Sequence, residues 1–197
     1  PAYVYSYNQA IAEGYLVPPV IRLDRLVMSD ETVALIEQAR ESKGDDELRE
    51  LAKSLMDDGI VEWTCAAADR HLTGRHILVF CCDLQQARAT AAGLTDAGRK
   101  AVVVSGETPK GQRRALLRQF ERGEIDALVN CTVLTEGTDL PITDGLIMAR
   151  PFSSKPLFIQ ALGRGLRTCQ KTGKTDCVVV DLLGATEEHS LTHAVAM

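Results

Sequence analysis

The chain has no apolar run that approaches the roughly 18 residues needed to cross a membrane. At its opening, Pro1–Tyr5, it also lacks the basic start and the apolar stretch of a secretory signal. An initiator methionine is missing as well. We therefore expect an excised piece of a longer protein that is cytoplasmic and makes no membrane contact.

Zinc-ligand spacing is also missing, because none of the six cysteines forms a CxxC pair. Cys81 and Cys82 are adjacent in an expected strand, so their side chains face opposite sides and cannot chelate one ion. His189 and His193 are four residues apart, but no third ligand is evident. We expect no metal site, and we interpret the cysteines as buried thiols in a reducing compartment.

A surplus of basic residues is absent too, and the formal net charge is −5. Residues 1–70 hold seven Lys or Arg and fourteen Asp or Glu, whereas residues 71–197 hold fifteen and thirteen, a net charge of +2. The second part contains a basic run, namely Lys110, Arg113, Arg114, Arg118 and Arg122. Because local patches govern phosphate contact more than the total charge does, a nucleic-acid partner is not excluded.

From Arg75 onward, apolar runs rich in β-branched residues alternate with amphipathic stretches. The runs predict strands at His76–Cys82, Ala101–Ser105, Ile125–Cys131, Gly145–Ala149 and Asp176–Leu183. The stretches between them predict helices at Leu84–Asp96, Pro109–Arg122 and Pro156–Leu166. Continuous apolar strands separated by helices are typical of a mostly parallel sheet covered on both faces, so we predict an α/β fold.

The first 70 residues lack this alternation and predict an N-terminal helical extension. Tyr15–Met28 is expected to be extended or hairpin-like. Helices are expected at Asp30–Arg40, at Asp45–Asp57 and from Gly59 or Ile60 to His71. We therefore predict one α/β domain that carries additional helices at its amino end.

Arg164 and Arg167 are the most informative residues, at the end of the helix expected near Pro156–Leu166. Residues three apart lie on one helical face, so the two guanidinium groups would point at a single target. Such a pair suits a polyanion, above all a triphosphate whose charge must be neutralised during cleavage. Two arginines on a helix are more often a solvated face, so this interpretation needs support from other residues.

Two turns carry further candidates. Ser105 and Gly106 precede a helix and would present backbone donors to a phosphate, while Arg113 could hold the next phosphate. Gly137 permits a close approach of the backbone to a ligand, and Asp139 could accept hydrogen bonds from a ribose. The structural alternatives are an ordinary Asx turn and a capped helix with solvated arginines. We expect every candidate at the carboxyl ends of the strands.

Taken together, these segments resemble the second RecA-like lobe of superfamily II helicases, in the DEAD/DEAH-like branch of restriction-type translocases and XPB-like helicases. The segments that carry the resemblance occur in the family's order: Phe80 within Ile77–Cys81, Ser105–Gly106 with Arg113, Thr135–Asp139, and Gln160–Arg167 in the pattern QxxGRxxR. The opening, Tyr3–Pro18, is similar to the segment that joins the two lobes. The resemblance implies three parts: an inter-lobe linker at 1–28, a helical extension at 29–72 and the RecA-like domain at 73–197.

The resemblance also implies roles in an ATP-dependent motor. Arg164 and Arg167 would be arginine fingers for ATP, which is held with Mg²⁺ mainly by an absent N-terminal lobe of the same protein. Four residues would adjoin the nucleotide, namely Gly137, Asp139, Gln160 and Gly163. Gln160 would couple the nucleotide to motion between the lobes.

A second group would contact the backbone of DNA or RNA, with DNA favoured, without sequence specificity: Ser105, Gly106, Arg113, Cys131 and Thr132. Many relatives have an alcohol where Cys131 stands, so this phosphate contact would pass to Thr132 or to a backbone amide.

The chain has no GxxxxGK[ST] loop for a triphosphate. Gly173-Lys174-Thr175 imitates the end of such a loop, but Thr168 replaces its first glycine and a strand is expected to follow. No Asp-Glu pair follows an apolar strand to hold Mg²⁺. We therefore expect no ATPase activity from the chain alone. The alternatives are a non-catalytic RecA-like module that binds nucleic acid or protein, and a small-molecule enzyme on a flavodoxin-like sheet.

Overall fold

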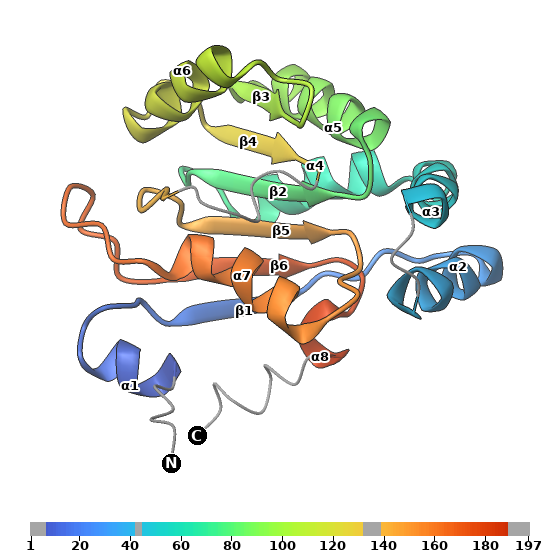
Figure 1. The fold of residues 1–197 in the computed structure, drawn as a ribbon, viewed down its shortest axis with the longest axis horizontal. Helices are drawn as coiled ribbons and strands as arrows, with labels where there is room; N and C mark the ends of the chain where they lie inside the picture. Colours follow the sequence, from blue (N-terminus) through green and yellow to red (C-terminus); the bar gives the residue numbers. More distant parts are fainter. Residues whose placement is uncertain (1–6, 42–44, 132–138, 189–197) are drawn as a thin grey trace.

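The computed structural model describes residues 7–41, 45–131 and 139–188. Within them, six strands form one sheet in the order β1-β6-β5-β2-β4-β3, and all neighbouring strands are parallel. The strands are β1 (Pro19–Leu23), β2 (Ile77–Cys81), β3 (Ala101–Val104), β4 (Ala127–Asn130), β5 (Gly145–Ala149) and β6 (Cys177–Asp181). The predicted α/β fold with a parallel sheet is confirmed. All carboxyl ends of the strands therefore lie along one edge, and all amino ends along the other (Figure 1).

Helices cover both faces of this sheet (Figure 1). They are α1 (Tyr7–Ala12), α2 (Asp30–Glu41), α3 (Asp45–Asp57), α4 (Ile60–His71), α5 (Leu84–Asp96), α6 (Lys110–Glu121), α7 (Lys155–Leu166) and the short α8 (Ala185–Glu188). On one face, α6 and α7 bury Phe120 and Phe158 with strand residues such as Leu78. On the other, α2 to α5 share one apolar cluster with the alternate strand residues, including Val79 and Ile147.

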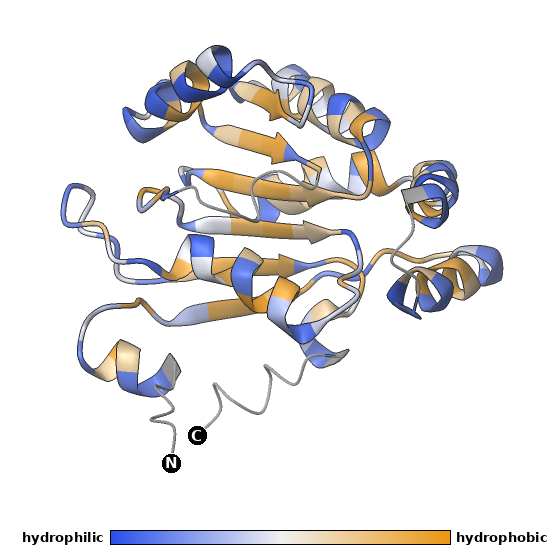
Figure 2. Cartoon of the chain, viewed as in Figure 1, coloured by the Kyte–Doolittle hydropathy of each residue, from blue (hydrophilic) through white to orange (hydrophobic). Residues whose placement is uncertain are grey.

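Figure 2 shows the physical basis of this layering, with the central strands mostly apolar and the helices hydrophilic on their outer sides. Strands β2, β4, β5 and β6 are buried at every position, as the continuous apolar runs predict. Among the described cysteines, Cys65 is partly exposed and the others are buried. In the described ranges no helix is both long and apolar enough to cross a membrane. No group of three or more His, Cys, Asp or Glu within those ranges is placed to hold a metal.

Two local features go beyond the sequence expectation. The segment predicted as extended or hairpin-like contains β1, which joins the sheet as an edge strand and pairs with β6 from Pro19↔Cys177 onward. A short helix, α1, precedes it. The segment predicted as an inter-lobe linker thus contributes a strand to the sheet, while the division at 28 and 72 stays a prediction. The limits of α3 and α5 agree with the sequence expectation residue for residue.

Gly165 lets α7 approach the sheet closely. A Cβ at this position would lie 2.5 Å from Sγ of Cys177 and 2.9 Å from Cγ of Leu146. Both neighbours are fully buried, so they cannot easily give way. We expect Gly165→Ala to lower the free energy of unfolding by about 1–3 kcal/mol through overpacking, measured by urea denaturation.

The matched control is Gly111→Ala in α6, where an added Cβ meets no atom within 4 Å. Because alanine is the better helix former, this control should leave stability unchanged or raise it by up to about 1 kcal/mol. Equal effects of the two substitutions would show that the close contact of α7 with the sheet is not required.

Candidate functional site

The arginine pair lies at the end of α7, but not on one helical face. Arg164 is in the last turn and partly exposed, whereas Arg167 follows the last helical residue with an extended backbone (φ −64°, ψ 140°). The expected shared helical face is therefore wrong. Arg167 nevertheless reaches Asp139, since its Nη1 lies 2.6 Å from Oδ1 of the carboxylate. Burial and the charge of Arg167 lower the pKa of Arg164, and the carboxylate of Asp139 opposes this shift.

The contact between Arg167 and Asp139 is exposed, with 51% and 64% of the two side chains accessible. An exposed ion pair contributes only about 0–1 kcal/mol. A more highly charged anion could therefore replace the carboxylate at little cost. The two guanidinium groups and one exchangeable carboxylate form a site suited to a phosphate chain.

The backbone at the end of α7 is tied to the segment that precedes β1. The N–H of Val17 donates to the carbonyl of Leu166 (2.7 Å), and Leu16 forms an isolated antiparallel bridge with Arg167. Two other predicted nucleotide contacts, the exposed Gln160 and the partly exposed Gly163, also lie on α7. The remaining one, Gly137, lies outside the described residues.

Asp139, Arg164 and Arg167 lie toward the amino edge of the sheet, so the expectation that all candidates sit at the carboxyl ends is wrong. α7 begins after the carboxyl end of β5 and runs back across the sheet to the amino end of β6 (Figure 1). A helix that connects parallel strands must return in this way, so its last turn lies at the opposite edge from its first. Asp139 likewise precedes β5.

The predicted nucleic-acid contacts lie at the carboxyl edge. Ser105 and Gly106 follow β3, and Cys131 follows β4. Ser105 is buried within its turn, where its N–H donates to Oγ1 of Thr108 (3.0 Å) and its Oγ accepts from the N–H of Glu107 (3.2 Å). Gly106 is exposed at the tip of this turn. The structure therefore separates the candidates into two groups at opposite edges of one sheet.

Arg113 is hydrogen-bonded to backbone carbonyls of the same turn. Its Nη2 donates to the carbonyls of Ser105 (2.9 Å) and Thr108 (3.2 Å). A phosphate contact by Arg113 stays a prediction, because this hydrogen bonding already uses part of the guanidinium. Burial raises the pKa of Cys131, so its thiol is neutral, and Thr132 lies outside the described residues.

The five residues of the basic run on α6 differ in their contacts and in their exposure. Arg113 faces the turn, and Nη1 of Arg122 lies 3.7 Å from Oε1 of Glu124. Three others are exposed on the outer side of the helix: Lys110, Arg114 and Arg118. No acidic residue in the described part of the chain forms an ion pair with any of these three. They are spaced four residues apart and therefore form one basic stripe.

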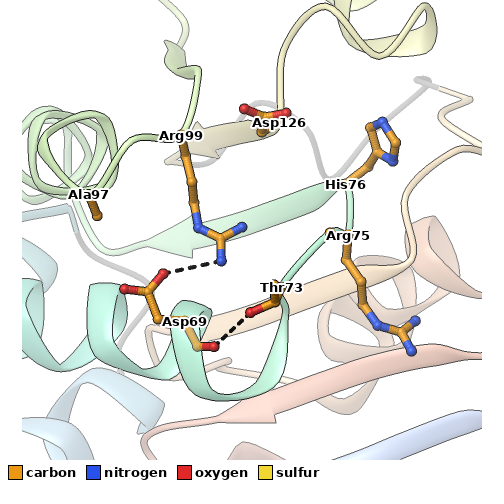
Figure 3. Close-up of a pocket in the computed structure, with 8 residues that line it drawn as sticks. Asp69, Thr73, Arg75, His76, Ala97, Arg99 and Asp126 are labelled. Carbon is orange, nitrogen blue, oxygen red and sulfur yellow. Dashed lines mark hydrogen bonds and ion pairs between the residues drawn. The ribbon is translucent and has the colours of Figure 1, made fainter.

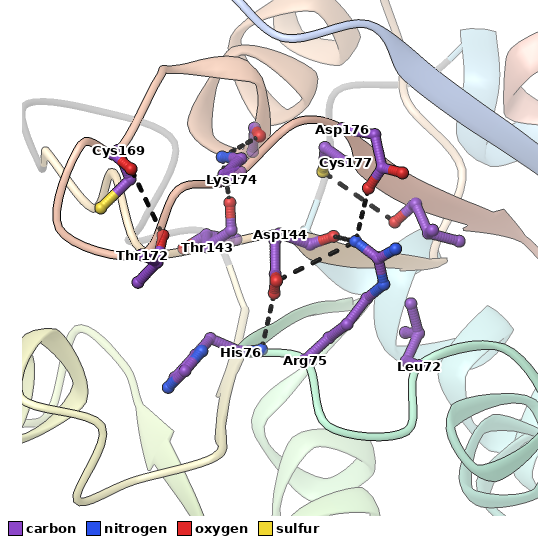
Figure 4. Close-up of polar contacts among 12 residues, drawn as sticks. Leu72, Arg75, His76, Thr143, Asp144, Cys169, Thr172, Lys174, Asp176 and Cys177 are labelled. Atoms are coloured by element: carbon purple, nitrogen blue, oxygen red, sulfur yellow. Dashed lines mark hydrogen bonds and ion pairs between the residues drawn. The ribbon is translucent and has the colours of Figure 1, made fainter.

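Sequence reasoning missed Lys174 as a functional candidate. Its ammonium lies among backbone carbonyls at the amino edge of the sheet, beside the loop that precedes β5 (Figure 4). A strand follows it, β6, so the rejection of a phosphate-binding loop here agrees with the structure. Its partners are distant in sequence, so no local pattern could have revealed them.

A hollow of about 430 Å³ lies at the amino ends of β2 and β4. Figure 3 shows the guanidinium of Arg99 directed toward Asp69, at 3.2 Å. The same guanidinium donates to the carbonyls of Ala68 (3.0 Å) and Leu72 (3.3 Å). These contacts tie α4 to the start of β3, so we interpret the hollow as part of the packing.

Comparisons with known proteins found relatives in sequence and in fold. Residues 60–169 match the family model described as "Helicase conserved C-terminal domain". The "Putative ATP-dependent helicase IRC3" of Saccharomyces cerevisiae is 38% identical over 90 residues, which cover 46% of the chain and 13% of that protein. The "Putative DNA 3'-5' helicase Rad25" of Haloarcula marismortui is 30% identical over 183 residues, which cover 93% of the chain and 27% of that protein.

Among solved structures, the fragment of "a putative HsdR subunit of a type I restriction enzyme from Vibrio vulnificus YJ016" superposes with a TM-score of 0.66 at 24% identity. The superposition covers 100% of the chain and 37% of that structure. The chain thus spans between 13% and 27% of the length of these two curated relatives.

Proposed function

Since the chain belongs to the helicase conserved C-terminal domain family of superfamily II, we propose that it is the second motor lobe of an ATP-dependent helicase or translocase. The observation that carries this proposal is the exposed ion pair of Arg167 with Asp139, both of whose charges act on the nearby guanidinium of Arg164. ATP and Mg²⁺ would be held mainly by an N-terminal lobe of the same protein. When the lobes close, the triphosphate would displace Asp139 and bind the two guanidinium groups.

The chemistry of such a step fits this geometry. Charge spreads over the oxygens of the γ-phosphoryl group during transfer, and fixed cations stabilise it. Arginine suits this role because its planar guanidinium remains protonated and can bind two oxygens at once. Gln160 would adjoin the same nucleotide from the middle of α7. Reopening after hydrolysis would release the grip of the lobe on its nucleic acid.

The first experiment measures ATP hydrolysis by the full-length parent with single-stranded DNA, double-stranded DNA and RNA. A motor predicts stimulation by nucleic acid, and no hydrolysis by the 197 residues alone. The name of the Haloarcula relative, a DNA 3'-5' helicase, supports DNA as the polymer. A parent that binds nucleic acid but shows no stimulated hydrolysis would favour the alternative, a non-catalytic binding module.

The basic stripe of α6 supports a polyanionic partner. Lys110 is next to the Ser105–Gly106 turn, and Arg114 and Arg118 continue the stripe along the helix. In a chain with a net charge of −5, three exposed cations that lack an ion-pair partner among the described residues form a local site for phosphates. Contact with the sugar-phosphate backbone of the nucleic acid alone would give affinity without sequence specificity.

We expect the triple variant Lys110→Gln/Arg114→Gln/Arg118→Gln to weaken DNA binding by the parent, and to do so most at low salt. Each lost phosphate contact reduces the slope of log K against log [salt] by about 0.9 on duplex DNA. The slope should therefore become shallower by up to about three, measured by fluorescence anisotropy over a range of salt concentrations.

The control changes the net charge equally by replacing three exposed basic residues of β1 and α3 with glutamine, namely Arg22, Arg49 and Lys53. If this control shifts the slope as much as the α6 variant does, the effect reflects total charge, and the stripe is not a contact surface.

A further inference from the structure

Lys174 lies on the turn between α7 and β6, with its side chain directed back into the protein. Gly173 adopts a left-handed conformation (φ 64°), and its N–H donates to the carbonyl of Cys169 (3.1 Å), which closes the turn. This geometry brings the ammonium of Lys174 among four backbone carbonyls, at 2.5 to 3.3 Å: those of Pro141, Thr143, Gly165 and Arg167.

These carbonyls belong to the two segments that carry the arginine site. Pro141 and Thr143 follow Asp139 in the chain, whereas Gly165 and Arg167 end α7. A lysine ammonium can donate three hydrogen bonds, so this one group can bind carbonyls of both segments at once. Carbonyls in the last turn of a helix have no partner inside the helix, and a cation placed there also interacts favourably with the helix dipole.

Lys174 is partly buried, and its ammonium lies near acidic groups. Burial lowers the pKa of Lys174, and the nearby acidic groups, among them Asp144, oppose this shift. Nη1 of Arg75 lies 2.6 Å from Oδ1 of Asp176 and 3.2 Å from the carbonyl of Asp144 (Figure 4). Arg75, which precedes β2, therefore links the end of the turn that carries Lys174 to the residue before β5.

We propose that Lys174 is a positioning residue for the arginine site, because it fixes the end of α7 against the segment that carries Asp139. This inference rests on the proposed function. The Arg167–Asp139 pair joins the same two segments, but as an exposed pair it is too weak to set their separation. Lys174 binds their backbones instead, so Asp139 can leave Arg167 while the backbone geometry is kept.

The test uses the parent protein and Lys174→Met, which keeps the length of the side chain but removes the ammonium. A displacement of about 1 Å at a reacting site can cost up to about 100-fold in rate. We expect nucleic-acid-stimulated kcat to fall about 10-fold to 100-fold, with little change in KM for ATP or in DNA affinity. The matched control is Lys171→Met, since Lys171 is exposed and donates only to the carbonyl of Glu121 (3.1 Å) among the described residues.

A double-mutant cycle separates positioning from a general effect on folding. If Lys174 acts through Arg167, Lys174→Met should have almost no further effect on turnover in an Arg167→Ala background, because interacting residues are not additive. Independent, multiplicative losses would overturn the proposal. The proposal would also be overturned if Arg167→Ala lowers turnover but the turnover of Lys174→Met equals that of Lys171→Met.

The proposed function fails in a different way, namely if Arg167→Ala itself leaves turnover unchanged. Thermal melting of each variant checks that it is folded at the assay temperature. Should Lys174→Met unfold there, turnover of all variants is measured at a lower temperature, at which Lys174→Met is folded. Turnover of the folded Lys174→Met equal to that of Lys171→Met would then overturn the positioning role.

Discussion

We expect that replacing Arg164 and Arg167 together by alanine will lower ATP turnover by the parent protein at least ~10³-fold, the lower limit typical of an arginine finger. The expectation rests on the proposed function: Arg167 pairs with Asp139, both charges act on Arg164, and a triphosphate held by the other lobe would bind at this place. The loss should appear in kcat at saturating nucleic acid, because the charge that they stabilise develops during transfer. Phosphate release in the steady state measures it.

The control for this pair is Arg22→Ala/Arg49→Ala, which removes two exposed arginines from β1 and α3. It should leave turnover close to that of the wild type. Lysine at 164 and 167 should not restore the rate, because an ammonium cannot bind two oxygens in the planar geometry of arginine. Turnover of the alanine pair equal to that of the control would assign the arginines a structural role and contradict the motor proposal.

We expect Asp181→Asn to lower the free energy of unfolding of the chain by at least about 3 kcal/mol, because hydrogen bonds to a buried charged group contribute about 1.5–3 kcal/mol each. Asp181 is fully buried at the end of β6. Its carboxylate accepts from four backbone N–H groups and one hydroxyl, at 2.5 to 3.2 Å, in the segment Leu183–Thr186. Asparagine has one acceptor oxygen and presents an NH₂ group to donors.

Urea denaturation measures this loss against Asp126→Asn, the same substitution at a less buried carboxylate. Asp126 accepts from one backbone N–H, that of Lys100 (2.7 Å), and should cost about 1 kcal/mol. Equal losses at the two positions would mean that the bonds at Asp181 are replaced readily by water or by rearrangement of the segment.

The central strands were predictable from the sequence because a strand that is buried on both faces appears as an uninterrupted run of apolar residues. The runs at Ile77–Cys81 and Gly145–Ala149 are apolar at every position, and both are buried throughout. The pairing of β1 within the sheet was not predicted, because Pro19–Leu23 is a partly exposed edge strand that contains Arg22. Its place in the sheet depends on pairing with β6, which is more than 150 residues away in the sequence.

Residue types in the sequence indicated the candidate site, whereas the arrangement of its residues depends on the tertiary fold. The pattern QxxGRxxR drew attention to Arg164 and Arg167, yet it could not show that Arg167 has an extended backbone and forms an ion pair with Asp139. Lys174 had no readable signal, since its acceptors are backbone carbonyls, which every residue type provides. Hydrogen bonds between a side chain and a distant backbone depend on the tertiary fold and leave no spacing pattern.

The bridge between Leu16 and Arg167 has a mechanical consequence. The chain ahead of β1 is tied to the end of α7 by the antiparallel bridge between Leu16 and Arg167 and by the hydrogen bond from the N–H of Val17 to the carbonyl of Leu166. Tension applied along the polypeptide before Leu16 would therefore act on the end of α7 before it reaches the sheet. A pull would arrive beside the second arginine through two residues, ahead of the pairing of β1 with β6.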